Sequence, residues 1–414
     1  MSDRTMIPEI GPQQVKDAFT FTDEVVEGYP GRLAGSEACR KAAERIKAEF
    51  ERFCDAGTVK AEQCDIHPQS LVKFVPALVV LYYACILLLY FMPALAWVSF
   101  AGLALGLFAY YGQAVRQWLL LDPLFPKKKG YNVYGSIEPS GEVKQQVILS
   151  GHHDAAYVFQ IRAYLPKLYA PLRTIGALVL VIAVLVSLVA AILLCFGITL
   201  SQWVALVLLI LGIFVLPFLF LTTNAASPAA GDDMMAVAIA AGIGKLFSDA
   251  KRAGSNPLKH TRLILLSFDA EECGLRGSHA WVKRHLAELR ATKTFAFNMD
   301  PIYKFKYIEF YDADLSGKVK LSKEMAQECV DIATALGYKA YIAPPRRGSA
   351  TDAASYGAAG IEATNLHGMS SKESDLAGWV YHTRNDISKY IEPQVVEASL
   401  KIVRGYILRK DAGV

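Results

Sequence analysis

The chain has 414 residues, of which 53% are hydrophobic and 20% are charged, and its formal net charge is only +4. So small a net charge argues against a nucleic acid partner, because such binding needs a concentrated positive field. Its seven cysteines, an odd number, do not suggest a disulfide framework and suit a reducing compartment. The N-terminal sequence MSDRTMIPEIGPQQVKDAF has no apolar core and does not resemble a signal peptide.

Residues 1–73 contain a helical pattern, RKAAERIKAEFERF, and are expected to form the N-terminal part of a water-soluble domain. Residues 74–115 then include no charged side chain. A membrane crossing takes about 20 helical residues, so this run predicts a transmembrane hairpin with helices over 74–91 and 95–111.

Residues 116–173 return to mixed composition and contain the apolar strand VILS, which is followed by SGHHD with His152. Residues 174–223 again include no charged side chain. They predict a second transmembrane hairpin, with helices over 175–196 and 203–221.

Two hairpins return the chain to its starting side, so all the polar segments are expected to share one face of the membrane. The basic residues that flank the spans on that face are Lys73, Arg116, Lys127, Lys128, Lys129, Arg162, Lys167 and Arg173. The short turns at the other ends of the spans contain no Lys or Arg. The positive-inside rule therefore predicts an integral membrane protein with its polar domain and both termini in the cytoplasm.

Residues 224–414 are expected to form the main part of the water-soluble domain. Apolar strands at 262–268 and 295–300 alternate with helical patterns at 236–252 and 278–290. Together with VILS, this alternation predicts an α/β fold with a mostly parallel mixed sheet and helices on both faces. In such a sheet the reactive crevice lies at the carboxyl ends of the strands.

Acidic and histidine residues occur in five separate segments, several of them at the ends of these strands. They are His152 in SGHHD, Asp232 in AAGDDMM, Glu271 and Glu272 in DAEECGLRGS, Asp300 in FNMD, and His382 in YHTRND. Imidazoles and carboxylates are ligands that zinc prefers, and one carboxylate can bridge two ions. The segments therefore indicate a two-metal hydrolase site.

The order of these segments resembles peptidase family M28, the co-catalytic zinc aminopeptidases, whose relatives include glutamate carboxypeptidase and glutaminyl cyclase. That family's pattern has HxD, then DD, then EE before a Gly-rich turn, an Asp that closes a strand, and a late His in YHTxxD. Upstream, GRLAGSEACRKAAERIKAEFE resembles the start of the family's first helix. The chain departs from the pattern at Met234 and Ala353, where the family usually has Asn and His. The resemblance implies the fold of a zinc aminopeptidase.

Carried over to this chain, the resemblance implies two zinc ions, with other divalent metals as alternatives. His152 and Asp300 would hold one ion, and Glu272 and His382 the other. Asp232 would bridge the two ions.

The resemblance also assigns Glu271 as the general base. Adjacent residues at a strand end point in different directions, so one glutamate can bind metal while Glu271 reaches the reacting water. Asp154 can accept the second ring N–H of His152, which would fix a metal-binding tautomer. We expect Asp233 to serve His382 in the same way.

The function that follows is hydrolysis of an amide bond. The leading expectation is an aminopeptidase, because the free amine of a substrate can sit on one metal. Short, apolar or membrane-associated peptides are the expected substrates, because both ends of the second hairpin adjoin the metal-binding segments. A carboxypeptidase or an N-acyl amino acid hydrolase is the alternative, since Arg346 and Arg347 could hold a carboxylate. A receptor or scaffold without catalysis is a third interpretation. Such a protein would be expected to lack some of the metal-binding residues, and this chain has all of them.

Overall fold

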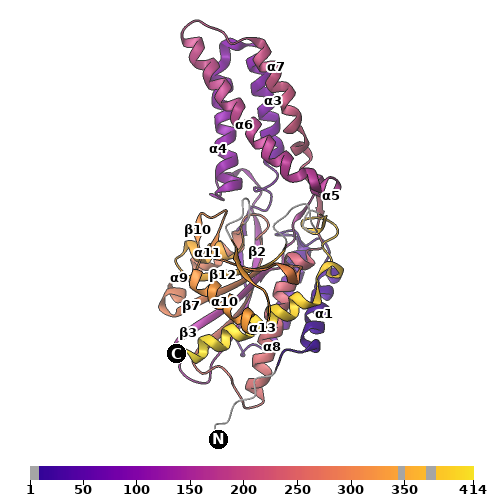
Figure 1. Ribbon diagram of the computed structural model, residues 1–414, viewed down its shortest axis with the longest axis vertical. Helices are drawn as coiled ribbons and strands as arrows, with labels where there is room; N and C mark the ends of the chain where they lie inside the picture. The colour runs from indigo at the N-terminus through magenta and orange to yellow at the C-terminus, as the bar shows by residue number, and fades with distance from the viewer. Residues whose placement is uncertain (1–8, 344–349, 370–378) are drawn as a thin grey trace.

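The computed structural model describes residues 9–343, 350–369 and 379–414. It consists of an α/β domain and a helical bundle that extends from one end of this domain (Figure 1). Hairpin 1 of the bundle contains α3 (Val75–Phe91) and α4 (Ala96–Tyr110). Hairpin 2 contains α6 (Pro166–Cys195) and α7 (Gln202–Leu211).

Eight strands form the central sheet of the α/β domain, in the order β1-β2-β6-β3-β7-β12-β8-β11. They are β1 (Lys60–Ile66), β2 (Lys128–Ile137), β3 (Gln145–His152), β6 (Thr261–Phe268), β7 (Lys293–Ile302), β8 (Ile308–Tyr311), β11 (Tyr341–Ala343) and β12 (Glu362–Gly368). The central strands β6, β3, β7 and β12 run parallel, whereas β1, β2 and β8 add antiparallel pairs. The expected mixed sheet is therefore present. β1 and β2 are neighbours in it although hairpin 1 separates them along the chain.

Helices cover both faces of this sheet, as the alternation of patterns predicts. Because side chains alternate along a strand, Val147 and Leu149 of β3 enter the larger hydrophobic core, and Ile148 enters the smaller one. The helices around the larger core are α1 (Pro12–Gly28), α2 (Glu37–Glu51), α8 (Met235–Arg252), α10 (Lys323–Ala335) and α13 (Pro393–Ala412). Those around the smaller core are α9 (Arg276–Ala291) and α11 (Ala353–Ala358).

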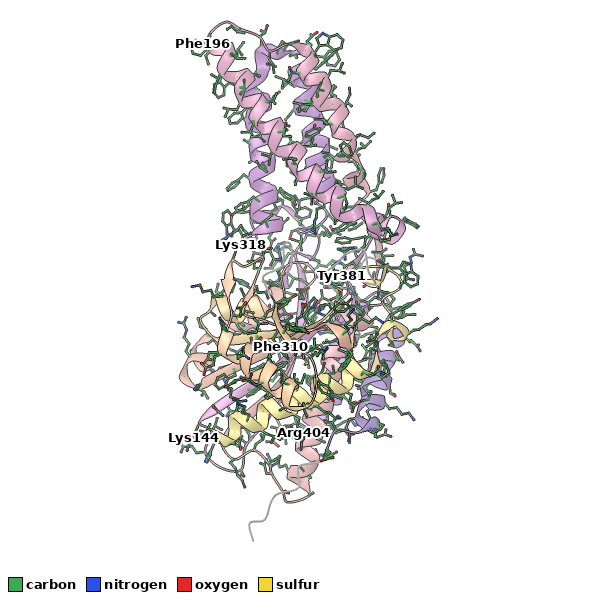
Figure 2. The ribbon with its side chains drawn as sticks, viewed as in Figure 1. Lys144, Phe196, Phe310, Lys318, Tyr381 and Arg404 are labelled. Atoms are coloured by element: carbon green, nitrogen blue, oxygen red, sulfur yellow. The ribbon has the colours of Figure 1, made fainter. Side chains whose placement is uncertain are left out.

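The bundle is apolar both inside and outside. Its interior contains few polar contacts, such as the Tyr82 hydroxyl, which donates to the carbonyl of Leu208 at 2.6 Å. On its outer surface, Leu105 of α4 is 65% exposed and Ile210 of α7 is 63% exposed. Figure 2 shows apolar side chains along the whole bundle up to Phe196 at its tip. An apolar surface of this extent is unusual for a protein that is surrounded by water.

The helices differ in length from the expected spans. Among the described residues only Pro93–Val115 and Pro166–Cys195 are long and apolar enough to cross a membrane, whereas Val75–Phe91 and Gln202–Phe214 are apolar but shorter. The sequence predicts four membrane spans, but only two of the described apolar stretches are long enough for one. The last predicted helix gives way to 3-10 turns around Pro217, because proline lacks an N–H and clashes with the preceding turn.

Hairpin 2 is closed at its base by a two-stranded ribbon. Here β4 (Tyr157–Phe159) pairs with β5 (Thr222–Ala226) in antiparallel fashion. The N–H of Phe159 also donates to the carbonyl of His382 at 3.0 Å. The base of hairpin 2 is therefore joined directly to the segment that carries the last predicted metal ligand.

Candidate metal centre

The ends of three parallel strands bring the first group of site residues together. His152 is the last residue of β3, Glu271 and Glu272 lie in the turn after β6, and Asp300 lies near the end of β7. Because these strands are neighbours and run parallel, their carboxyl ends lie on one edge of the sheet. Asp232 comes from the turn before α8.

Among the described residues, two of the four groups of atoms that could hold a metal share Asp232. One group contains His152, Asp232 and Asp300, and the other contains Asp232, Glu272 and His382, with all atoms of a group within 4.8 Å of one another. One oxygen of Asp232 lies 3.4 Å from Nε2 of His152, and the other lies 3.1 Å from Nε2 of His382. Asp232 thus presents one carboxylate oxygen to each group.

Several of these atoms are buried without a hydrogen-bond partner among the described residues. They are Nε2 of His152, Oδ2 of Asp232, Oε1 of Glu272, and both ring nitrogens of His382. Buried polar atoms that face one another without partners are costly unless a further group binds them. Two imidazoles and three carboxylates are a donor set that zinc favours, so the residues present fit zinc.

Glu271 lies beside these groups. Its Oε2 atom is 3.9 Å from Nε2 of His152. Burial raises the pKa of Glu271 well above its ordinary value, and the carboxylates of Asp300 and Glu272 add to this effect. A raised pKa suits a group that takes up and releases a proton. Cations bound nearby would lower the pKa of Glu271 again, toward the neutral pH range.

Asp154 supports both sides of the site. Its Oδ1 atom lies 3.3 Å from Nδ1 of His152, the position that the sequence predicts. The same carboxylate accepts the backbone N–H groups of Glu271 at 3.0 Å and of Glu272 at 3.2 Å. One side chain therefore orients a histidine and fixes the turn that carries the glutamate pair.

Asp233 does not serve His382, contrary to the expectation. Its carboxylate accepts the backbone N–H of His152 at 3.1 Å, because Asp232 and Asp233 are consecutive and point to different sides of their turn. The His382 ring instead stacks on Tyr381, with ring centroids 3.9 Å apart, and contacts the Phe159 ring edge-on at 5.0 Å.

Two buried aspartates next to the site were not found from the sequence. Asp386 accepts the N–H of Gly231 at 2.8 Å and so holds the turn before Asp232. Asp352 is fully buried, and burial raises its pKa to about 7. The position of Asp386 inside YHTRND was a signal for Asp386, whereas Asp352 directly precedes Ala353, where the chain departs from the family pattern. Arg346 and Arg347, predicted to bind substrate, lie outside the described residues.

The sequence of residues 218–407 matches the model of peptidase family M28. No curated protein matches the chain. Among solved structures, a zinc aminopeptidase from Bacillus subtilis has a TM-score of 0.57 at 14% identity, with 97% of this chain and 96% of that chain covered. A Zn-dependent exopeptidase from Parabacteroides distasonis has a TM-score of 0.54 at 13% identity, with 97% and 99% covered.

A glutaminyl cyclase from Porphyromonas gingivalis is similar to the same degree, with a TM-score of 0.56 at 14% identity and with 96% of this chain and 98% of that chain covered. At such identities the likeness concerns the fold alone. Residues 218–407 are therefore similar in sequence to peptidase family M28, and the chain has the fold of the zinc aminopeptidases and glutaminyl cyclases.

Proposed function

We propose that the protein is a membrane-integral dizinc aminopeptidase for short, apolar or membrane-associated peptides. The observation that carries the proposal is the position of Asp232, which presents one oxygen to each of two groups of metal-binding atoms. His152 and Asp300 would hold one zinc ion, and Glu272 and His382 the other. A shared carboxylate of this kind is expected where two ions act on one substrate.

The residues of the site have distinct tasks in this mechanism. When bound, the zinc ions would polarise the scissile carbonyl and increase the acidity of water. Glu271 takes a proton from the attacking water and passes it to the leaving amine. Asp154 keeps the His152 ring and the backbone of the glutamate turn in place during this transfer.

Membrane insertion is proposed for the bundle, with the α/β domain and both termini in the cytoplasm. The apolar outer surface of the four helices supports insertion, and the shorter apolar helices α3 and α7 would cross beside the two longer apolar stretches, Pro93–Val115 and Pro166–Cys195. The basic residues at the domain end of the bundle support the cytoplasmic orientation.

The attachment of hairpin 2 to the site supports an apolar or membrane-associated substrate. Because the N–H of Phe159 donates a hydrogen bond to the carbonyl of His382, the site lies beside the base of the bundle. An apolar tail on the substrate adds up to about 0.8 kcal/mol of membrane partitioning per CH₂ group. In liposomes, KM for one scissile bond should therefore fall with tail length while kcat changes little.

Hydrolysis by detergent-purified protein tests the proposal. Aminoacyl, N-acyl and C-terminal reporter substrates would be compared after chelation and again after addition of zinc. Zinc-dependent cleavage of aminoacyl substrates is expected, and it should be lost in Asp232→Ala but kept in Asp249→Ala, which changes an exposed carboxylate on α8. Preferred cleavage of N-acyl or C-terminal reporters would favour the alternative hydrolases, and absence of zinc-dependent cleavage would contradict the proposal.

A further inference from the structure

Arg162 is a buried arginine at the base of hairpin 2. It belongs to the short helix α5 (Gln160–Tyr164), and only 6% of it is exposed. Its Nε atom is buried and has no hydrogen-bond partner within the described part of the chain. A guanidinium carries a full charge, so burying one of its N–H donors without an acceptor is costly. This cost suggests that a further group completes the site.

Two tyrosine rings hold the guanidinium. Its central carbon lies 4.5 Å from the ring centroid of Tyr169 and 4.9 Å from that of Tyr381. Aromatic faces attract the cation but leave the in-plane N–H groups without acceptors. The rings therefore fix the plane of the guanidinium and offset only a part of its desolvation.

Tyr381 connects Arg162 to the metal centre. The Tyr381 ring stacks on the imidazole of His382 with an angle of 21° between the ring planes. Arg162 and His382 thus contact the same aromatic ring. Phe159 closes the other side of this aromatic group, with its ring 5.0 Å from His382 and 6.1 Å from Tyr169. Figure 2 shows Tyr381 at the end of the α/β domain from which the bundle extends.

The carboxylates of the metal centre do not pair with this arginine. The oxygens of Asp232 and Glu272 face the imidazole of His382, at 3.1 and 3.2 Å. Arg162 lies beyond Tyr381, outside both groups of metal-binding atoms. Since no described residue accepts from Nε of Arg162, a bound molecule that also reaches the metal centre is a fitting acceptor.

We infer that Arg162, held by Tyr169 and Tyr381, is a subsite for a free carboxylate of the substrate. The inference rests on the proposed zinc hydrolase and specifies its substrate class. A planar carboxylate accepts two parallel N–H bonds from a guanidinium, which favours it over a neutral amide. Two sources share this chemistry: the C-terminus of a very short peptide, and the carboxylate of an N-acyl amino acid.

Matched substrates test the subsite. Leucylglycine would be compared with leucylglycinamide, and N-lauroyl-leucine with N-lauroyl-leucinamide, on detergent-purified protein with zinc. We expect the wild-type protein to prefer the free acid by about tenfold or more in kcat/KM, mainly through KM. The pair that shows this preference identifies the source of the carboxylate.

Variants of Arg162 separate recognition from folding. In Arg162→Met the ratio of kcat/KM between acid and amide should fall by about 10- to 100-fold, and Arg162→Lys should be intermediate because lysine lacks the planar fork. Arg116→Met is the matched control, because Arg116 also lies over an aromatic ring, that of Trp118 at 5.6 Å, but at the base of hairpin 1. Its ratio should equal that of the wild type.

Two results would overturn the inference: equal cleavage of acid and amide by the wild-type protein, or an unchanged ratio in Arg162→Met. The first measurement needs no variant and stays decisive where Arg162→Met fails to fold. Zinc-dependent cleavage without a preference for the acid would contradict the carboxylate subsite alone. Absence of zinc-dependent cleavage of every substrate would contradict the proposed function itself.

Discussion

The side chains of Arg276 and Asp122 form a buried ion pair, with Nη2 and Oδ1 2.5 Å apart, where the α/β domain meets hairpin 1. Arg276 follows the turn of Glu271 and Glu272, whereas Asp122 follows the end of hairpin 1. Ser70, which precedes hairpin 1, donates its hydroxyl to the same Asp122 oxygen at 2.7 Å. This polar cluster connects the turn of Glu271 and Glu272 to both ends of hairpin 1.

Breaking this ion pair should destabilise the protein strongly. In Asp122→Asn the buried guanidinium of Arg276 loses its counter-charge, which typically costs about 3–5 kcal/mol. Thermal unfolding in detergent would measure the loss. Asp65→Asn is the control, because its partners Lys127 and Lys129 are exposed and such surface pairs contribute about 1 kcal/mol or less. Equal losses of stability in Asp122→Asn and Asp65→Asn would show that the buried pair contributes no more than the surface pair.

Glu271→Gln should separate metal binding from catalysis. Glutamine keeps the size of the side chain but cannot accept a proton, so kcat is expected to fall by about 10²- to 10⁴-fold. The zinc content should stay at the wild-type level, because Glu271 is the proposed general base and the five proposed ligands remain; it lies near His152 and Glu272 but in neither group that shares Asp232. Elemental analysis and initial rates on the same sample would check both points. A variant with nearly wild-type kcat would exclude Glu271 as the general base.

Asp232→Ala should lower the zinc content more than the loss of Asp300 or His382. Its carboxylate belongs to both groups of metal-binding atoms, whereas Asp300 and His382 each belong to one. We expect the affinity for both ions to fall in Asp232→Ala, and that for one ion in His382→Ala. Zinc titration followed by elemental analysis distinguishes the two patterns. Identical zinc content in both variants would contradict the bridging role.

The buried carboxyl of Asp314 should make the folded protein more stable as the pH falls. Burial raises its pKa to about 6, although it accepts the hydroxyl of Thr351 at 2.7 Å. The folded protein therefore binds this proton more tightly than the unfolded chain, and the stability from this group grows as the pH falls through 6. Between pH 7 and pH 5 the wild-type protein should gain about 1 kcal/mol relative to Asp314→Asn. If the thermal unfolding of the wild-type protein and of Asp314→Asn depends on pH in the same way, this expectation is wrong.

Cysteine labelling tests the orientation. Cys195 is the exposed one of the seven cysteines, so Cys195→Ser provides a background with little reactivity. Thr199→Cys would place a thiol at the tip of hairpin 2, and Lys283→Cys would place one on α9. A membrane-impermeant maleimide added to intact cells should label the first variant and spare the second until the cells are lysed. The opposite pattern would reverse the orientation while leaving the enzyme proposal intact.

The metal-binding segments were accessible to sequence reasoning because each combines a distinctive residue type with a strand end. His152 and Asp300 follow apolar strands, and parallel neighbouring strands bring such ends together whatever the details of packing. Asp352 and Arg162 were not assigned to the site. Their positions depend on how a later segment and the base of a hairpin fold over the site, which no local pattern encodes.

The lengths of the bundle helices were also not predictable from apolar composition. α6 begins at Pro166, well before the charge-free run, because proline favours the first turn of a helix. The polar ends of Lys167 and Arg173 do not interrupt it, since helices tolerate such side chains near their ends. A charge-free window therefore locates the apolar part of a helix but not its beginning.

The insertion of hairpin 1 between β1 and β2 has a consequence for biosynthesis. β1 pairs with β2 from Lys60 to Ile66, and it cannot do so until the ribosome has delivered all of hairpin 1 and the residues as far as Tyr134. With the bundle in a membrane, as proposed, translocon insertion precedes completion of the sheet edge. Until β2 has been synthesised, β1 would lack its partner strand, and unpaired strand edges are prone to aggregation. Completion of this sheet edge would then follow the delivery of hairpin 1 to the bilayer.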